Sequence, residues 1–298
     1  MPPAPLTSEQ RLALIQKYID RMPSLSTTVT KVLEICNKPN TSANDLNRVI
    51  SLDPVLTGQV LKLINSAYYS LPNQISSLTR AIIMLGINTV KNLALSTAVL
   101  GTIGKEESFQ SLRMDDFWAH SICVGVTAKA MAVRKGIPVA LQEEFFVAGL
   151  LHDLGKIPLN NCFAAEYRQT LDLADLEQGA LVRAEEMMLG LDHGVVGRMI
   201  AEKWQLSPAL RELLAFHHAP HQAGEKFRAL VGVVALANSY ANLFDFGSAG
   251  DRYPDILWMP ELLSQLGMRW EDISTLHETV EAEIRKAQIF LQVARGAA

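Results

Sequence analysis

The spacing of the apolar residues is the feature that most limits how this chain can fold. Along most of its 298 residues, apolar side chains recur at three- and four-residue intervals, as Leu12, Ile15 and Ile19 do. Sustained alternation of apolar and polar residues, which marks a half-buried strand, is nearly absent. Apolar residues make up 49% of the chain and charged residues 19%, which is enough to build a packed core. We therefore predict an all-α fold.

Helix start and stop signals divide this pattern into segments. Asp53-Pro54 ends one helix and begins the next, because the residue before a proline avoids helical geometry and a proline fits the first helical position. Ser207-Pro208 is a similar helix start. The predicted helices cover residues 8–19, 27–37, 42–53, 55–66, 78–85, 88–100, 112–134, 139–153, 177–190, 193–205, 208–218, 225–244, 259–267 and 270–294.

The polar, glycine-containing segment 101–110 predicts a hinge between two helical parts. We expect residues 1–14 to form a tail and the start of the first helix, 15–105 an N-terminal helical lobe, 106–245 a helical bundle, and 246–298 a C-terminal helical extension. The last helix carries an apolar stripe at Val280, Ile284, Ile289 and Val293. Such a stripe is usually core packing. Homodimerisation is the alternative.

Charge, cysteine content and hydropathy exclude several classes of protein. The net charge of −4 argues against general nucleic-acid binding. The three cysteines are odd in number and far apart, so neither a disulfide framework nor a thiolate zinc site is predicted. The N-terminus does not resemble a secretion signal, and no apolar run is long enough to span a membrane. We expect a cytoplasmic protein.

The pair His152-Asp153 is the most informative chemical feature. It follows the apolar run 145–151, which belongs in a core, and a buried carboxylate needs a cation or strong hydrogen-bond donors nearby. Gly155 and Pro158 should stop the helix and leave the pair at a helix end, facing a cavity. Lys156, just beyond, is either an ordinary solvated lysine or one that reaches a bound phosphate.

Further histidines accompany this pair. Asp116 and His120 are spaced to share one helical face, His193 precedes a helix, and His217-His218 closes another. Imidazoles and carboxylates together suit iron, manganese, zinc or cobalt. Each histidine taken singly is more often a hydrogen-bonded core residue, and 217–218 is also a favourable helix C-terminus.

The order of these residues resembles the HD superfamily of metal-dependent phosphohydrolases. Four N-terminal segments narrow the resemblance to the HDOD domain, the HD-related output domain of bacterial signalling proteins, over about residues 15–240. These segments are Met22-Pro23-Ser24-Leu25, Ile50-Ser51-Leu52-Asp53-Pro54-Val55-Leu56, Leu63-Ile64-Asn65-Ser66-Ala67-Tyr68-Tyr69 and Ala81-Ile82-Ile83-Met84-Leu85-Gly86.

The resemblance implies an N-terminal lobe packed on an HD-type helical bundle. The pattern is also similar to the HD-GYP branch, whose members bind two or three metals and hydrolyse cyclic di-GMP. That similarity implies a set of metal ligands, with Asn238 at the position of a late aspartate. The implied ligands are Asp116, His120, His152, Asp153, His193, His217, His218 and Asn238. In an enzyme, Asp153 and Lys156 would act in catalysis, Lys156 by steadying the phosphate.

Two departures count against an enzyme. No Gly-Tyr-Pro element follows His218, and Asn238 brings no charge to a metal. HDOD domains are usually regulatory, so we expect a signal-transduction output module with a retained metal pocket and no catalytic turnover. We expect one or two divalent ions, iron or manganese with zinc as an alternative, and a signalling protein or small phosphorylated ligand as partner. The alternative function is a metal-dependent phosphohydrolase or phosphodiesterase acting on a nucleotide or cyclic dinucleotide.

Overall fold

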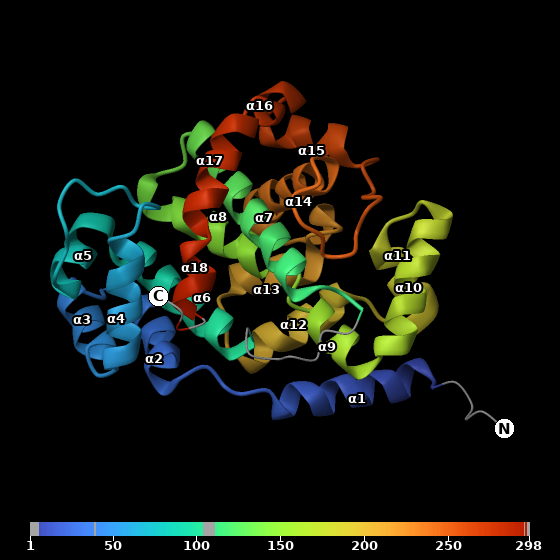
Figure 1. Cartoon of the computed structure of the whole chain (residues 1–298), viewed down its shortest axis with the longest axis horizontal. Coiled ribbons are helices and arrows are strands. Elements are labelled where there is room, and N and C mark those ends of the chain that lie inside the picture. Colours follow the sequence, from blue (N-terminus) through green and yellow to red (C-terminus); the bar gives the residue numbers. More distant parts are fainter. Residues whose placement is uncertain (1–5, 39, 104–110, 295, 297–298) are drawn as a thin grey trace.

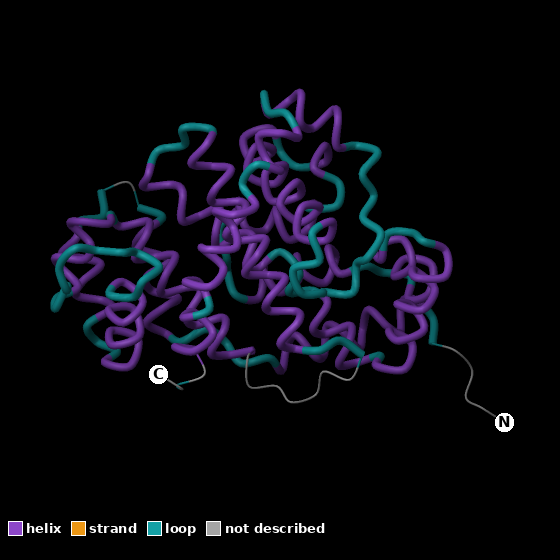
Figure 2. Tube along the Cα trace, turned by 45° about the horizontal axis from the view of Figure 1, so that its top comes forward, coloured by secondary structure: helices purple, strands orange, loops and turns teal. Residues whose placement is uncertain are grey.

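The chain folds into helices joined by loops and turns. In a computed structural model, which describes residues 6–38, 40–103, 111–294 and 296, every regular element is a helix. Figure 2 shows this directly: the described trace contains helix and loop but no strand. The prediction of an all-α fold is confirmed.

The helices fall into three groups along the chain. The N-terminal group comprises α1 (Ser8–Arg21), α2 (Thr27–Cys36), α3 (Ala43–Ile50), α4 (Pro54–Ile64), α5 (Leu78–Leu85) and α6 (Ile87–Ile103). The central group comprises α7 (Met114–Arg134), α8 (Val139–Leu151), α9 (Lys156–Cys162), α10 (Ala164–Glu177), α11 (Leu181–Leu189), α12 (His193–Lys203), α13 (Pro208–Phe216) and α14 (Arg228–Leu243), with the 3-10 turns η1 (Pro220–Gln222) and η2 (Glu225–Phe227) before α14. The C-terminal group comprises α15 (Met259–Leu266), α16 (Trp270–Ser274), α17 (His277–Ala287) and α18 (Ile289–Ala294).

Side-chain caps explain where many of these helices begin. The Asp53 carboxylate accepts a hydrogen bond from the Leu56 amide, and Pro54 occupies the first position of α4. Ser207 caps α13 in the same way, ahead of Pro208. These two helix starts, expected from the sequence, are confirmed.

The buried helix α6 joins the N-terminal lobe to the rest of the molecule. It packs against α2, α4 and α5 of the N-terminal group and also against α8 and α18 (Figure 1). Its side chains are buried on several faces, as its apolar sequence predicts. Helix α1 instead runs along α9 and α12 of the central group. Most of the expected hinge at 101–110 lies outside the described residues, and α6 continues to Ile103.

Two predicted helices were wrong in extent. The segment 177–190 is not one helix, because α10 ends at Glu177, Gln178 adopts a left-handed φ of 50°, and α11 starts at Leu181. The segment 270–294 is divided into α16, α17 and α18, because α17 packs on α7 whereas α18 packs on α4 and α6. The apolar stripe of this segment is core packing, with Val280 and Val293 buried.

No single helix in the described ranges has the length and apolar character needed to cross a membrane. Helices α5 and α6 meet that criterion only as a pair that bends by 117° between them, and most of α6 is buried.

A close crossing of α7 and α8 determines where the His-Asp pair lies. A Cβ atom added to Gly149 would lie 2.6 Å from the Gly125 Cα, and one added to Gly125 would lie 2.7 Å from the Phe146 carbonyl oxygen. Only glycine permits this approach of two helix backbones. The end of α8, which leads into His152 and Asp153, is thereby held against α7, which carries His120.

We predict that Gly149→Ala lowers the free energy of unfolding by about 1–3 kcal/mol, because its methyl group has to force the two helices apart. The matched control is Gly58→Ala, an exposed site within α4 with no atom within 4 Å of the added Cβ. That substitution should raise stability by about 0.5–1 kcal/mol through helix propensity. Denaturant unfolding measures both, and equal effects at the two glycines would contradict the close crossing.

Candidate metal centre

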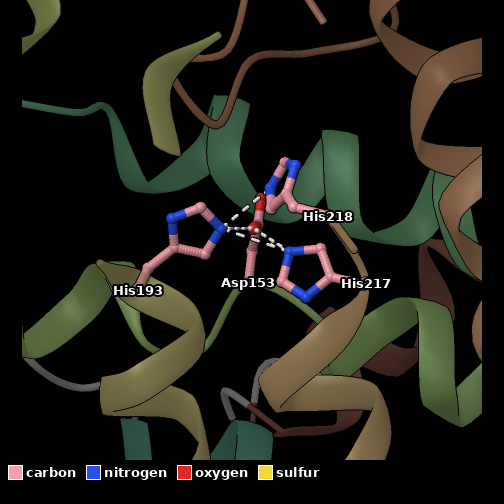
Figure 3. A group of neighbouring side chains, drawn as sticks. All are labelled: Asp153, His193, His217 and His218. Carbon is pink, nitrogen blue, oxygen red and sulfur yellow. Dashed lines mark hydrogen bonds and ion pairs between the residues drawn. The ribbon is translucent and has the colours of Figure 1, made fainter. Parts of the chain in front are cut away.

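The carboxylate of Asp153 lies at the centre of a cluster of histidines. Asp153 sits in the turn between α8 and α9 and is 1% exposed. Its Oδ1 atom is 3.3 Å from Nε2 of His193, at the start of α12, and 3.5 Å from Nε2 of His217, just after α13. The Nε2 atom of His218 is 3.0 Å from that of His193. Figure 3 shows the three imidazoles gathered around the carboxylate, with atoms close enough to share one ion.

A second group of ligand atoms gathers around the other carboxylate oxygen. Oδ2 of Asp153 is 3.2 Å from Nε2 of His152 and 3.9 Å from Nε2 of His120. His120, His152 and Asp153 therefore form a second set with metal-site spacing. Asp153 is common to both sets, as a bridging carboxylate would be.

Three of the histidines are held by acceptors at their other ring nitrogen. Nδ1 lies 2.7 Å from the Gly149 carbonyl oxygen in His152, and 3.3 Å from the Leu213 carbonyl oxygen in His217. In His193, Nδ1 lies 2.5 Å from Oε2 of Glu185. These acceptors assign the ring proton to Nδ1 and leave the Nε2 lone pair facing Asp153. His120 lacks such support, because its buried Nδ1 has no hydrogen-bond partner among the residues that the structure describes.

This arrangement fits a divalent cation. The lone pairs of neutral imidazoles converge on an ionised carboxylate, and acceptors facing one another repel unless a cation lies between them. Nε2 of His152 and Oδ1 of Asp153 are buried without a hydrogen-bond donor, which leaves them free to ligate. A mixed nitrogen and oxygen set suits iron, manganese or zinc better than magnesium.

Burial keeps two of these histidines, His120 and His217, in the neutral form that binds metals. Desolvation lowers the pKa of His120 to about 3 and that of His217 to about 4, so both rings are neutral at neutral pH. For Asp153, burial alone would raise the pKa, but electrostatic interactions with His152 and Lys156 outweigh it and hold the pKa well below its usual value. The carboxylate therefore remains ionised.

Lys156 is placed as a counter-ion to Asp153. The lysine side chain is fully buried, and its Nζ donates a hydrogen bond of 2.8 Å to Oδ2 of Asp153. The interpretation of Lys156 as a solvated lysine is wrong, since the core closes around it. The oxygen that accepts this hydrogen bond, Oδ2, is the same one that lies beside His152 and His120 in the second ligand set. A second cation there would meet a positive charge already in place.

The structure brings Asn238 to the cluster but not Asp116. Oδ1 of Asn238 lies 3.0 Å from Nε2 of His120. The Asp116 side chain is 41% exposed and lies 3.4 Å from Nε of Arg113, away from both ligand sets. Asp116 and His120 lie on the same helix, α7, as expected. His120 lies on the buried face of this helix, whereas Asp116 lies in its first turn, close to solvent.

Glu185, which no sequence pattern singled out, supports His193. This carboxylate is fully buried and accepts hydrogen bonds from the Tyr167 hydroxyl at 2.7 Å and from the His193 backbone amide at 2.9 Å, besides its contact with Nδ1. A signal was present, because Glu185 lies midway between Leu181 and Leu189 on the apolar face of α11. A carboxylate on such a face needs buried partners.

Gly155 explains how two distant segments meet at the site. A Cβ atom at this position would lie 1.8 Å from the carbonyl oxygen of His193. The turn after Asp153 therefore packs directly on the first residue of α12. Any side chain at position 155 would push His193 away from Asp153.

A hollow leads from the surface to the histidine side of the cluster. It has a volume of about 360 Å³ and is lined by His217 and His218 together with Arg183, Asp192 and Asp255. Arg183 forms an ion pair with Asp255 at this opening. A small molecule can thus approach His218, which is partly exposed.

We predict that Glu185→Gln weakens metal binding about 10- to 100-fold, because the amide no longer holds the His193 ring with a charged acceptor. Metal titration with a competing chelator measures the affinity. The control is Glu186→Gln, the same change at the exposed neighbouring residue. An unchanged affinity in Glu185→Gln would show that His193 is not a ligand.

The sequence and the fold of this chain match those of known proteins. Residues 22–220 match the family described as the HDOD domain. An HDOD domain protein of unknown function from Geobacter sulfurreducens has a crystal structure that is 25% identical in sequence, with a TM-score of 0.75, and the match covers 95% of this chain and 99% of that one. A protein from Shewanella amazonensis SB2B, provisionally named a phosphohydrolase, is also 25% identical, with a TM-score of 0.67 and coverage of 96% and 98%.

A curated relative is longer than this chain. An uncharacterised protein of Treponema pallidum (strain Nichols) is 25% identical over 278 residues, which are 91% of this chain and 52% of that protein. The chain therefore spans about half the length of this relative.

Proposed function

Because this chain belongs to the HDOD family, we propose that it is a regulatory output module of bacterial signal transduction, in which a divalent metal has a structural or ligand-sensing role rather than a catalytic one. The observation that carries the proposal is the unequal environment of the two Asp153 oxygens. Oδ1 faces His193 and His217, whereas Oδ2 is bonded to the buried ammonium of Lys156.

This asymmetry supports one tightly held ion. His193 and His217 each have an acceptor at Nδ1, and His218 completes that set. The second set has weaker support, since His120 lacks such an acceptor and Asn238 adds no negative charge. Iron or manganese suits the ligands best, with zinc as the alternative.

The same features argue against turnover. A lysine that steadies a phosphate has to present its ammonium to the substrate, and Lys156 is fully buried with Asp153 as its partner. Two-metal hydrolysis places an ion on each side of the reacting phosphate. One of the two positions here lies beside that ammonium.

A metal-dependent phosphohydrolase is the second candidate, favoured by the hollow that reaches His217 and His218. In that function Asp153 and the histidines would hold the metal, which when bound supplies a water of lowered pKa. Arg183 stands at the opening, where it is placed to attract a phosphate. A nucleotide or cyclic dinucleotide is the expected substrate class.

The partners follow from the regulatory proposal. We propose a signalling protein or a small phosphorylated ligand as the partner, and a cytoplasmic location. The apolar stripe of α17 and α18 is largely covered by the fold, so a homodimer would have to use another surface.

Metal content and turnover together test the proposal. We expect about one equivalent of iron or manganese in protein purified without chelator, and its loss in Asp153→Asn and His193→Ala. With metal bound, a panel of nucleotides and cyclic dinucleotides should remain uncleaved. Turnover that disappears in His152→Ala and Asp153→Ala would establish the hydrolase instead, and far less than one equivalent would refute both functions.

We also predict that Asn238→Asp increases the metal bound at the His120 side, because a carboxylate offsets the charge that an amide cannot. Elemental analysis should then show more than one ion per chain. Asn44→Asp makes the same charge change at an exposed residue of α3, outside both ligand sets, and should leave the metal content unaltered. Equal effects of the two substitutions would show that Asn238 acts only through general charge.

A further inference from the structure

A second hollow lies apart from the histidine cluster. It has a volume of about 330 Å³ and is lined by Tyr68 from the N-terminal lobe, by the C-terminal half of α7, by Leu276 and by α17. None of its lining residues belongs to either ligand set or to the opening at His217 and His218. Three parts of the chain that are distant in sequence therefore share one cavity.

The walls of this cavity are mainly apolar and have a fixed shape. Val126, Ala130, Val133 and Leu276 contribute aliphatic surface. The ring of Tyr68 is clamped by aromatic neighbours, with ring centroids 5.0 Å from Tyr69, 5.3 Å from Phe146 and 5.2 Å from Phe290. A preformed cavity of this size, with apolar walls and a few polar groups, is typical of small-molecule sites.

Every charged side chain in the lining already has a partner. Lys129 pairs with Glu143 at 2.7 Å, Arg134 with Asp272 at 3.1 Å, and Glu283 with Lys286 at 2.7 Å. A charged ligand would lose its hydration against aliphatic walls and find no free counter-charge. The cavity therefore favours an uncharged molecule.

Lys129 supplies one oriented hydrogen-bond donor. Its Nζ donates to the Tyr68 hydroxyl at 3.1 Å and to Oε2 of Glu143 at 2.7 Å, which uses two of the three N–H groups of an ammonium. The ammonium also lies 4.4 Å from the centre of the Tyr68 ring. Held in this way at the cavity wall, it has a third N–H group for an oxygen acceptor on a ligand.

We propose that this cavity binds an uncharged, mainly apolar small molecule of about the size of a bicyclic aromatic compound, whose hydroxyl or carbonyl oxygen accepts a hydrogen bond from Lys129. The molecule lies between Tyr68, α7 and α17, and its contacts join the N-terminal lobe to the C-terminal helices. This binding is independent of the metal and of any hydrolytic activity.

Three probes with one aromatic body test the ligand class. The full-length chain is titrated with 2-naphthol, which is uncharged, with the anion 2-naphthoate, and with the cation 2-naphthylmethylammonium, by calorimetry or by probe fluorescence. We expect saturable binding of 2-naphthol at one site, at least about tenfold tighter than that of either charged probe. Absence of saturable 2-naphthol binding below about 1 mM, or equal binding of a charged probe, overturns the proposal.

Paired substitutions test the location. Val133→Phe narrows the cavity from its exposed rim, whereas Val139→Phe makes the same change at an exposed residue outside the lining. We expect Val133→Phe to weaken 2-naphthol binding at least about tenfold and Val139→Phe to leave it unchanged. Ala130→Leu fills the cavity from a neighbouring position and provides a second variant if the first is unstable. Binding that survives both fillings in folded protein places the probe elsewhere and refutes the site.

Discussion

A single ionised carboxylate in the core imposes the main constraint on this structure. Asp153 lies at the end of the apolar helix α8, where an unpaired charge would be strongly destabilising. The buried ammonium of Lys156 binds one oxygen of this carboxylate. Imidazoles from three other segments of the chain surround the two oxygens. The arrangement requires backbones to approach closely, so glycines stand at positions 149 and 155, where a methyl group would collide with α7 and with His193.

The two oxygens of the Asp153 carboxylate have different neighbours, and this difference determines where a metal ion could bind. One side has the properties of a metal site: a neutral His217, acceptors at Nδ1 of His193 and His217, and a buried glutamate behind His193. On the other side, Oδ2 is already paired with the ammonium of Lys156. A chain with this asymmetry presents one group of side chains that could hold an ion without a protein ammonium beside it. The chain belongs to the HDOD family and shares its fold with a protein provisionally named as a phosphohydrolase.

Helix α7 connects the two candidate sites. His120 faces the carboxylate from its first half, and Lys129 and Val133 line the separate cavity in its second half. Tyr68 of the N-terminal lobe and residues of α17 both line this cavity, so a molecule bound there would contact the N-terminal lobe, α7 and α17 together. A ligand shifts a protein between two conformations only if its contacts differ between them. A site lined by several parts of the chain offers contacts of this kind.

The sequence alone determined the helical class, many of the helix starts and the identity of most residues in the cluster. These depend on local properties: apolar spacing, caps such as Asp53-Pro54, and the cost of a carboxylate after an apolar run. Only the tertiary structure decided which groups face each other. It buried Lys156 against Asp153, placed Glu185 behind His193, left Asp116 at the surface and divided the last helix where its packing partners change. Those outcomes depend on contacts between residues far apart in the chain, and the spacing of residues along the chain carries no information about such contacts.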